Sequence, residues 1–331
     1  MKLAGKRVLV TGGAGFIGSH LAEALLKGGC SVRVLVHYNS MGRWGYLDGL
    51  DGEVKDNLDI VLGDVSDAGS VGAAVSDRDV VFHLAALIGI PYSYRAPWSY
   101  VATNLIGTLN VLDACRANDV ERLVHTSTSE VYGTAMYTPI DESHPIQGQS
   151  PYSASKISAD KMAEAYSLSF NLPVATLRPF NTYGPRQSAR AVIPTIVAQA
   201  LRGQVVHLGS LFPIRDLTFV SDTVAAFMAI AESDSAIGRV VNAGNGHGIT
   251  IGELASTILR LMGRDDACRI VADPERVRPS GSEVGELICD NRLADELMGW
   301  KPAVKLESGL RQTIEYITTH PEMFRAERYN L

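Results

Sequence analysis

The sequence predicts an α/β fold, a Rossmann-type doubly wound parallel sheet with a smaller mixed α/β lobe toward the C-terminal end. Three observations predict it. Short β-rich runs alternate with helical stretches in the first half, a glycine-rich turn follows the first run, and elements become shorter and richer in Pro and Gly after about residue 180. We expect a first domain over residues 1–180 and a lobe over 181–331, with some chain crossing back to the first domain.

The expected strands are short runs rich in Val, Ile and Leu, which parallel strands buried on both faces require. They are Lys6–Thr11, Ser31–Val36, Leu58–Leu62, Val80–Leu84 and Arg122–Thr126. Apolar residues at helical spacing predict helices at Gly15–Leu26, Trp98–Ala117, Pro151–Phe170, Ile193–Arg202, Asp222–Glu232, Ile251–Met262 and Leu306–Thr318. Ser150 followed by Pro151 is typical of an N-cap and the first helical residue.

Composition excludes several classes of protein. The chain has 331 residues, 46% of them hydrophobic, and a net charge of −6 with scattered Lys and Arg, so we expect no nucleic-acid partner. Nowhere do roughly 18 apolar residues run together, so we expect no membrane span. The first apolar run ends at Thr11 without a cleavage site, which argues against a signal peptide and predicts a cytoplasmic protein.

Cysteine and histidine spacing indicates neither disulfides nor a metal site. The four cysteines form no Cys-x-x-Cys pair, so we expect free, mostly buried thiols. They are Cys30, Cys115, Cys268 and Cys289. No set of His, Cys, Asp and Glu has metal-ligand spacing, so no metal is expected. His83 and His125, at strand ends, are interpreted as packed or hydrogen-bonded core residues.

A glycine-rich turn predicts a dinucleotide site. Residues 8–18 read VLVTGGAGFIG, in which Gly13, Gly15 and Gly18 satisfy GxGxxG, and Gly12, Gly15 and Gly18 satisfy GxxGxxG. Glycines there permit a tight turn and a close approach of the backbone to a pyrophosphate, which sits on the N-terminus of the following helix. The residues expected to hold the cofactor at this turn are Gly12, Gly15, Phe16, Ile17 and Gly18.

The choice between NAD and NADP stays open, with NAD expected. The second strand usually ends in an acidic residue that binds the adenosine ribose, but here the segment reads Val-His-Tyr-Asn-Ser over 36–40. Arg33 and Arg43 lie nearby and would favour a 2′-phosphate. Asp64 follows the third strand and is a candidate for the adenine edge, or an ordinary loop residue. The further residues expected at the cofactor are His37, Asn39, Ser40, Asp64, Val65, Leu84, Ala85 and Ala86.

Tyr152 and Lys156 form the candidate catalytic pair. They lie four residues apart at the start of a predicted helix, so they share a face. A tyrosine with a pKa of about 10 is a poor base at neutral pH. A nearby ammonium and the positive nicotinamide ring would favour its phenolate and lower that pKa. Thr128 would hold a substrate hydroxyl in line, and both Tyr152 and Lys156 are also expected to contact the cofactor.

Several motifs together resemble the extended short-chain dehydrogenase/reductase family of sugar-nucleotide epimerases and dehydratases. They are TGGAGFIGSH, HLAA, TSTSEVYG, SPYSASK, RPFNTYGPRQ, RDLTFVSD and RPSGSEV, spread over nearly the whole chain. The resemblance implies a Ser/Thr-Tyr-Lys trio at Thr128, Tyr152 and Lys156. It also implies a nucleotide-sugar substrate and a homodimer built on the two long helices. Substrate contacts are then expected at Ser129, Asn181, Val192, Arg215 and Arg278, the two arginines clamping the diphosphate.

Glu130 indicates which reaction to expect. C4 epimerases that resemble this chain carry no carboxylate there, whereas a 4,6-dehydratase needs a base for the C5 proton. Glu130 lies two residues after Thr128, so we expect both side chains on one side of an extended strand end. The four residues expected to be catalytic are Thr128, Glu130, Tyr152 and Lys156.

The substrate expected is UDP- or GDP-N-acetylglucosamine. The dTDP-glucose 4,6-dehydratases show Asp-Glu where this chain has Ser129-Glu130. The string TSTSE is more similar to GDP-mannose 4,6-dehydratases and to the dehydratases of nucleotide-linked N-acetylglucosamine in legionaminic-acid-type pathways. The string YNS, which aromatic residues follow, and the string GPRQSARAVIPT resemble the second of these groups most. UDP-glucuronate decarboxylases and UDP-sugar C4 epimerases, which share the Thr/Tyr/Lys site, are the alternatives. A non-catalytic dinucleotide-binding protein is a remote one, because Tyr152 and Lys156 are both present.

Overall fold

The computed structural model of the protein describes residues 1–324. Residues 325–331, the end of the predicted second lobe, lie outside the described residues. The main sheet consists of β1 (Arg7–Thr11), β2 (Ser31–His37), β3 (Leu58–Gly63), β4 (Val80–His83), β5 (Arg122–Thr126), β6 (Val174–Pro179) and β10 (Val240–Ala243). Its strands run in the order β10-β6-β5-β4-β1-β2-β3, and every neighbouring pair is parallel. The predicted doubly wound parallel sheet is confirmed, and each predicted strand ends within one residue of its expected bounds.

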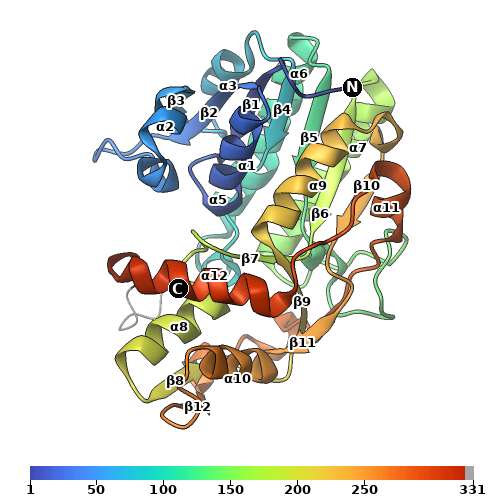
Figure 1. The fold of residues 1–331 in the computed structure, drawn as a ribbon. Coiled ribbons are helices and arrows are strands. Elements are labelled where there is room, and N and C mark those ends of the chain that lie inside the picture. Colours follow the sequence, from blue (N-terminus) through green and yellow to red (C-terminus); the bar gives the residue numbers. More distant parts are fainter. Residues whose placement is uncertain (325–331) are drawn as a thin grey trace.

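Helices cover both faces of this sheet (Figure 1). Alternate residues of β1 point to opposite faces: Val8 and Val10 pack with α1 (Phe16–Lys27) and α9 (Val220–Glu232), and Leu9 packs with the helices of the other face. Those helices are α3 (Ala68–Val75), α6 (Gly107–Ala117) and α7 (Pro151–Phe170). The two cores bury the central strands β4 and β5 almost completely, as their near-continuous apolar runs require, whereas the edge strand β3 is only partly buried.

The two long predicted helices differ in outcome. The one at Pro151–Phe170 is confirmed, and Ser150 caps it in a reciprocal capping box with Ser153. The one predicted over 98–117 is not a single regular helix but α5 (Pro97–Tyr100), a π-helical segment at Val101–Ile106, and α6. Asn104 lies in the π segment, where its side chain bonds both backbone groups of Leu87 and the hydroxyl of Ser155. Apolar spacing cannot reveal such a widened turn, since it depends on partners from elsewhere in the chain.

The smaller lobe lies beyond the carboxyl ends of the main strands (Figure 1). Its helices are α8 (Val192–Arg202), α10 (Ile251–Leu261) and α12 (Leu306–Thr319). Its strands are β7 (Asn181–Tyr183), β9 (Ile214–Phe219), β11 (Gly248–Thr250) and β13 (Glu286–Leu287), joined around β9, and the separate pair β8 (Val205–Leu208) and β12 (Arg269–Ala272). The remaining helices are α2 (Gly52–Asp56), α4 (Ile90–Arg95) and α11 (Arg292–Met298). Chain from beyond residue 180 returns to the first sheet as α9 and β10.

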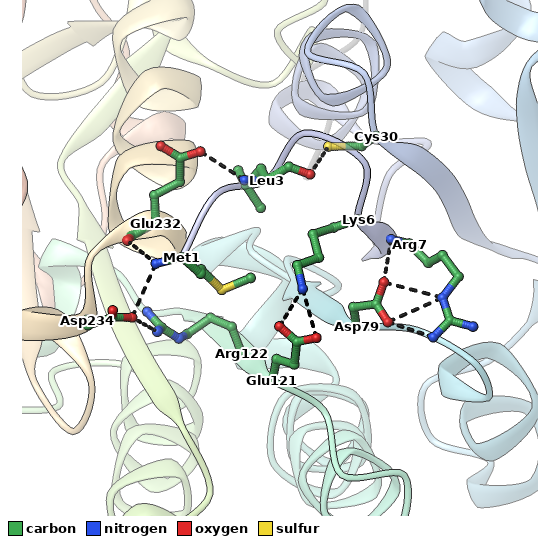
Figure 2. A network of polar contacts seen from close by, with 10 residues as sticks. All are labelled: Met1, Leu3, Lys6, Arg7, Cys30, Asp79, Glu121, Arg122, Glu232 and Asp234. Atoms are coloured by element: carbon green, nitrogen blue, oxygen red, sulfur yellow. Dashed lines mark hydrogen bonds and ion pairs between the residues drawn. The ribbon is translucent and has the colours of Figure 1, made fainter.

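A network of ion pairs fastens α9 at the amino edge of the sheet (Figure 2). The buried guanidinium of Arg122, at the start of β5, donates to the carbonyls of Ala231 and Ser233 and to Asp234. These carbonyls end α9, where cations are favoured. Glu232 accepts from the backbone N–H of Leu3 at 2.9 Å. The other end of α9 directly follows β9.

The described residues agree with the expectations on thiols. All four cysteines are free and buried, which confirms the prediction. Within residues 1–324 there is no helix with the length and apolarity that a bilayer crossing requires. Within the same residues, no group of three or more His, Cys, Asp and Glu side chains is arranged to hold a metal ion.

Candidate active site

The site lies where the strand order reverses. β1 pairs with β2 on one side and with β4 on the other, so the chain leaves β1 and β4 in opposite directions and opens a crevice at their carboxyl ends. Ligands of doubly wound sheets bind at this point. The glycine turn follows β1, and Leu84, Ala85 and Ala86 follow β4, so these two predicted cofactor segments lie side by side.

The glycine turn is shaped to receive a pyrophosphate. Gly12 has φ +70°, and a side chain there would lie 2.7 Å from the backbone nitrogen of Ala85, so only glycine fits. Gly15 is the N-cap of α1 and has no side-chain cap. The backbone N–H groups of Phe16, Ile17 and Gly18 in the first turn are therefore free to bind an anion, which the positive end of the helix also favours.

The adenosine end is built from the loops after β2 and β3. His37 and Asp64 meet there, with Nδ1 and Oδ2 3.4 Å apart. Asn39 closes its own loop: its Oδ1 accepts from the backbone of Met41 and Arg43, and its Nδ2 donates to the carbonyl of Arg43. Ser40 lies exposed in the same loop, and Val65 is buried just after Asp64.

The suggestion that Arg33 favours a 2′-phosphate is wrong. Its Nε donates to Asp59 at 2.6 Å, and its Nη1 donates to the carbonyls of Ala73, Ala74 and Ser76. The guanidinium therefore links β2 to β3 and to the C-terminal end of α3. Arg43 is exposed in the loop that follows β2.

The Thr128, Tyr152 and Lys156 side chains come together at the carboxyl end of β5. Tyr152 is buried, and its ring meets Tyr100 edge to face at 6.2 Å. Burial raises the pKa of the Tyr152 phenol, a hydrogen bond with Thr128 lowers it, and the Glu130 carboxylate raises it further. Lys156 is also buried, and its Nζ donates to the carbonyl of Thr126 at 2.6 Å. Among the protein groups alone, the expected lowering of the pKa of Tyr152 is therefore not found.

Glu130 reaches the site by a different backbone path from the one predicted. The segment Ser129–Tyr132 is a 3₁₀ turn and not an extended strand end, because the Thr128 side chain caps it by accepting from the N–H of Glu130. The charge of the Glu130 carboxylate nevertheless raises the pKa of both the Tyr152 phenol and the Arg215 guanidinium. Ser129 is buried in the same turn.

Two arginines of the smaller lobe extend the site. Arg215, on β9, is buried, and Arg278 precedes β13. Glu283 lies between them, its Oε1 3.6 Å from Arg215 Nη2 and 4.0 Å from Arg278 Nη1. Burial lowers the pKa of Arg215, and Glu130 and Glu283 oppose that change. Glu283 thus has two guanidiniums around it, so one positive charge of these three groups is in excess, and a diphosphate is a ligand that such a pair of guanidiniums can bind.

The start of the smaller lobe supplies an unpaired polar atom. Asn181 is the first residue of β7, and its Oδ1 is buried without a hydrogen-bond partner. A buried polar atom of this kind costs free energy unless a ligand or water bonds it. Val192 begins α8, close in sequence to this segment, and is partly buried.

Sequence reasoning missed a set of buried polar residues beneath Lys156. Asp160, His125, Ser127 and Arg178 bond one another there. His125 is thus hydrogen-bonded within the core, as predicted, and His83 bonds the hydroxyls of Thr11 and Thr108. Asp160 follows Lys156 by one helical turn, which was a usable signal. Its partners come from β5, from the residue that directly follows β5, and from β6, so only the fold reveals them.

Comparison with known proteins gives consistent matches over nearly the whole chain. Residues 9–313 match the protein family described as GDP-mannose 4,6 dehydratase. A UDP-glucose 4-epimerase of Mycolicibacterium smegmatis is 34% identical over 94% of this chain and 98% of its own. A UDP-N-acetyl-α-D-glucosaminuronate decarboxylase of Bacillus cytotoxicus is 34% identical over 94% of this chain and 97% of its own. The solved dTDP-glucose 4,6-dehydratase of Streptomyces venezuelae, with NAD bound, superposes with a TM-score of 0.87 at 30% identity, covering 96% of this chain and 99% of that chain.

Proposed function

The chain belongs to the family of nucleotide-sugar dehydratases, epimerases and decarboxylases, and we propose from that premise that it is an NAD-dependent 4,6-dehydratase of a nucleotide-activated hexose. The substrate we propose is UDP- or GDP-N-acetylglucosamine, and the product its 4-keto-6-deoxy sugar. The observation that supports this choice is the position of the Glu130 carboxylate. Its charge raises the pKa of both Tyr152 and Arg215, the residue predicted to bind the diphosphate.

The residues of the glycine turn fit NAD. The uncapped N-terminus of α1 would hold the pyrophosphate, and the loops after β2 and β3 would hold the adenosine. When bound, NAD accepts and returns a hydride. Because Arg33 donates a hydrogen bond to Asp59, its guanidinium is not left to bind a 2′-phosphate, which supports NAD over NADP.

The side chains divide the proton transfers between them. Tyr152 would take the proton of the C4 hydroxyl, which Thr128 holds in line through its own hydroxyl. A ketone at C4 acidifies the C5 proton, and Glu130 would remove it. The same carboxylic acid would then return that proton to the C6 hydroxyl, so that the C6–O bond breaks and water leaves. The resulting C5=C6 bond would take up the hydride at C6 and a proton at C5, and that proton balances the one that Tyr152 removed from the C4 hydroxyl. Arg215 and Arg278 would hold the diphosphate while Asn181 bonds the substrate.

The experiment that tests this proposal incubates the purified protein with NAD and, separately, UDP- and GDP-N-acetylglucosamine, and measures the product by mass spectrometry. Loss of one water supports the proposal. Unchanged mass with altered retention indicates C4 epimerisation. Loss of carbon dioxide from UDP-glucuronate or its N-acetylated analogue, with no reaction of the neutral sugars, indicates decarboxylation. Either of the last two results would replace the dehydratase assignment.

We also propose a homodimer in the cytoplasm. Large apolar side chains are exposed on α5, the π segment and α7, among them Trp98 at 75% and Leu168 at 78% exposure. Large exposed apolar side chains on neighbouring helices are a feature of many protein–protein interfaces. A second copy of the chain would cover it by pairing these helices. Sedimentation showing a monomer at micromolar concentration would overturn the dimer. Four buried, free thiols support a reducing compartment.

A further inference from the structure

A buried charge cluster lies directly beneath the proposed base. Asp160 follows Lys156 by one turn of α7, and its carboxylate accepts hydrogen bonds from His125 Nε2 at 3.1 Å, Ser127 Oγ at 2.6 Å and Arg178 Nη2 at 2.9 Å. The side chains of Lys156, Asp160 and Arg178 are each at most 5% exposed. The chemistry proposed above uses none of Asp160, His125 and Arg178.

The two histidines near this cluster are neutral. His125 donates from Nε2 to Asp160, and its Nδ1 has no partner, as in the neutral tautomer. Burial lowers the pKa of His125, and burial likewise lowers the pKa of His83 well below its ordinary value. Both ring nitrogens of His83 are hydrogen-bonded, one to the hydroxyl of Thr11 and the other to that of Thr108.

The remaining charges do not balance. Lys156 and Arg178 are two cations, and Asp160 is the single carboxylate between them. Burial would raise the pKa of Asp160, but the hydrogen bond from His125, the charge that the His125 ring carries in acid, and the charges of Arg178 and Lys156 bring it to about 2. When Lys156 is charged, the cluster therefore carries one positive charge in excess. Ionisation of Tyr152 would neutralise that excess. The charge of the Glu130 carboxylate raises the pKa of the Tyr152 phenol and so acts against its ionisation.

We propose that Asp160 is a positioning residue that keeps Lys156 charged. With Asp160 in place, the arrangement of a Tyr152 phenolate beside a Lys156 ammonium is favoured over a phenol beside a neutral amine. The proposal rests on the proposed function, because it takes Tyr152 as the base. Asp160 touches neither substrate nor cofactor in this scheme. It acts only through Lys156.

The physical reason lies in two arrangements that bind the same number of protons. One is a phenolate at Tyr152 with an ammonium at Lys156, and the other is a phenol with a neutral amine. Their ratio does not depend on pH and is set by the local charges. Burial lowers the pKa of Lys156 to about 8, and Asp160 is the group that opposes this. Asp160 also raises the pKa of Tyr152, but it is the weakest of the groups that act on the phenol. Removal of the Asp160 charge should therefore favour the inactive, neutral arrangement.

Titration of Lys156 tests the proposal without requiring turnover. In protein with ¹³C,¹⁵N-labelled lysine, the Lys156 signal is assigned by its absence in Lys156→Met and followed by NMR against pH. We expect Asp160→Asn to lower the Lys156 midpoint by about 1 to 3 pH units. Asp160→Glu should restore it toward that of the wild type. An unchanged midpoint in Asp160→Asn would overturn the proposal.

Two variants separate charge from folding. Ser127→Ala removes a hydrogen bond to Asp160 but no charge, so the midpoint should stay in place. If Asp160→Asn does not fold, Asp160→Asn with Arg178→Gln removes one charge of each sign. Its Lys156 midpoint should still fall, because Arg178 is not among the groups that shift the pKa of Lys156. A midpoint in the double variant equal to that of the wild type contradicts the proposal.

The pH profile of turnover supplies the second readout. Asp160→Asn should lower the plateau of kcat at least about tenfold. It should also move the acid limb to lower pH, because loss of the carboxylate makes deprotonation of both groups easier. A lower plateau with an unmoved limb would show a purely structural role and overturn the proposal. If no substrate turns over, the dehydratase assignment fails while the NMR result still decides the role of Asp160.

Discussion

Arg33 Nε lies 2.6 Å from Asp59 Oδ2, so a cation that would favour a 2′-phosphate is committed to the neighbouring strand. At the adenosine end, the carboxylate of Asp64 is 43% exposed. A 2′-phosphate close to that carboxylate would be repelled.

The protein should therefore prefer NAD. We expect NAD to bind at least about tenfold more tightly than NADP, a difference of about 1.4 kcal/mol. Calorimetric titration of both cofactors measures it, with Arg33→Ala expected to leave the preference unchanged. Equal affinities would contradict this expectation, and loss of NADP binding in Arg43→Ala would then identify the cation responsible.

Glu130→Gln should abolish dehydration while leaving the cofactor site intact. Because the amide cannot take the C5 proton, kcat should fall about 10²- to 10⁴-fold. Mass spectrometry of the product measures the loss, and NAD affinity should not change. Glu164→Gln, on the exposed side of α7, is the matched control and should retain full turnover. Normal dehydration by Glu130→Gln would remove the assigned role.

Arg215 should contribute more than Arg278 to nucleotide binding. Arg215 is buried, with a side chain 9% exposed against 29% for Arg278, so its charge is less screened by water. We expect Arg215→Gln to weaken UDP or GDP binding by about 2 to 5 kcal/mol and Arg278→Gln by less. Calorimetry with the free nucleotide measures both, and exposed Arg260→Gln serves as the control. Equal losses, or a larger loss for Arg278→Gln, would contradict the assignment.

His20 should make the fold sensitive to mild acid. Burial lowers its pKa to about 4, with Arg186 acting in the same direction, and the ring is hydrogen-bonded to the carbonyl of Pro185. Between pH 6.5 and 4 the unfolded chain binds a proton that the folded chain does not. Stability attributable to His20 is therefore present above about pH 6.5 and is lost as the pH falls, by about 3 kcal/mol in all.

The measurement compares Tm of wild type and His20→Gln from about pH 7 to about pH 3.5, values that bracket the expected window of about 6.5 to 4. The variant should lose less stability across this range. The comparison is needed because Asp216, whose pKa burial raises to about 6, contributes with the opposite sign in the same range. Exposed His37→Gln should follow the wild type. Parallel curves for wild type and His20→Gln would refute the role of His20.

Much of the fold could be predicted because its signals are local. The alternation of strands and helices, the glycine turn and the Ser150 cap depend on residues within a few positions of one another. The four-residue spacing of Tyr152 and Lys156 is likewise a local property of one helix. The π segment at Val101–Ile106 escaped prediction because it is associated with contacts of Asn104 to residues 87 and 155.

The sequence by itself determined most of the secondary structure, the class of fold and the residue types available for catalysis. Only the tertiary structure decided which charges meet. It committed Arg33 to Asp59, set Glu283 between the two arginines, and gathered His125 and Arg178 around Asp160. Periodicity reports on neighbours along one helix or strand. The pKa and pairing of a buried side chain depend on groups that other strands and helices bring within a few ångströms, and no local pattern records them.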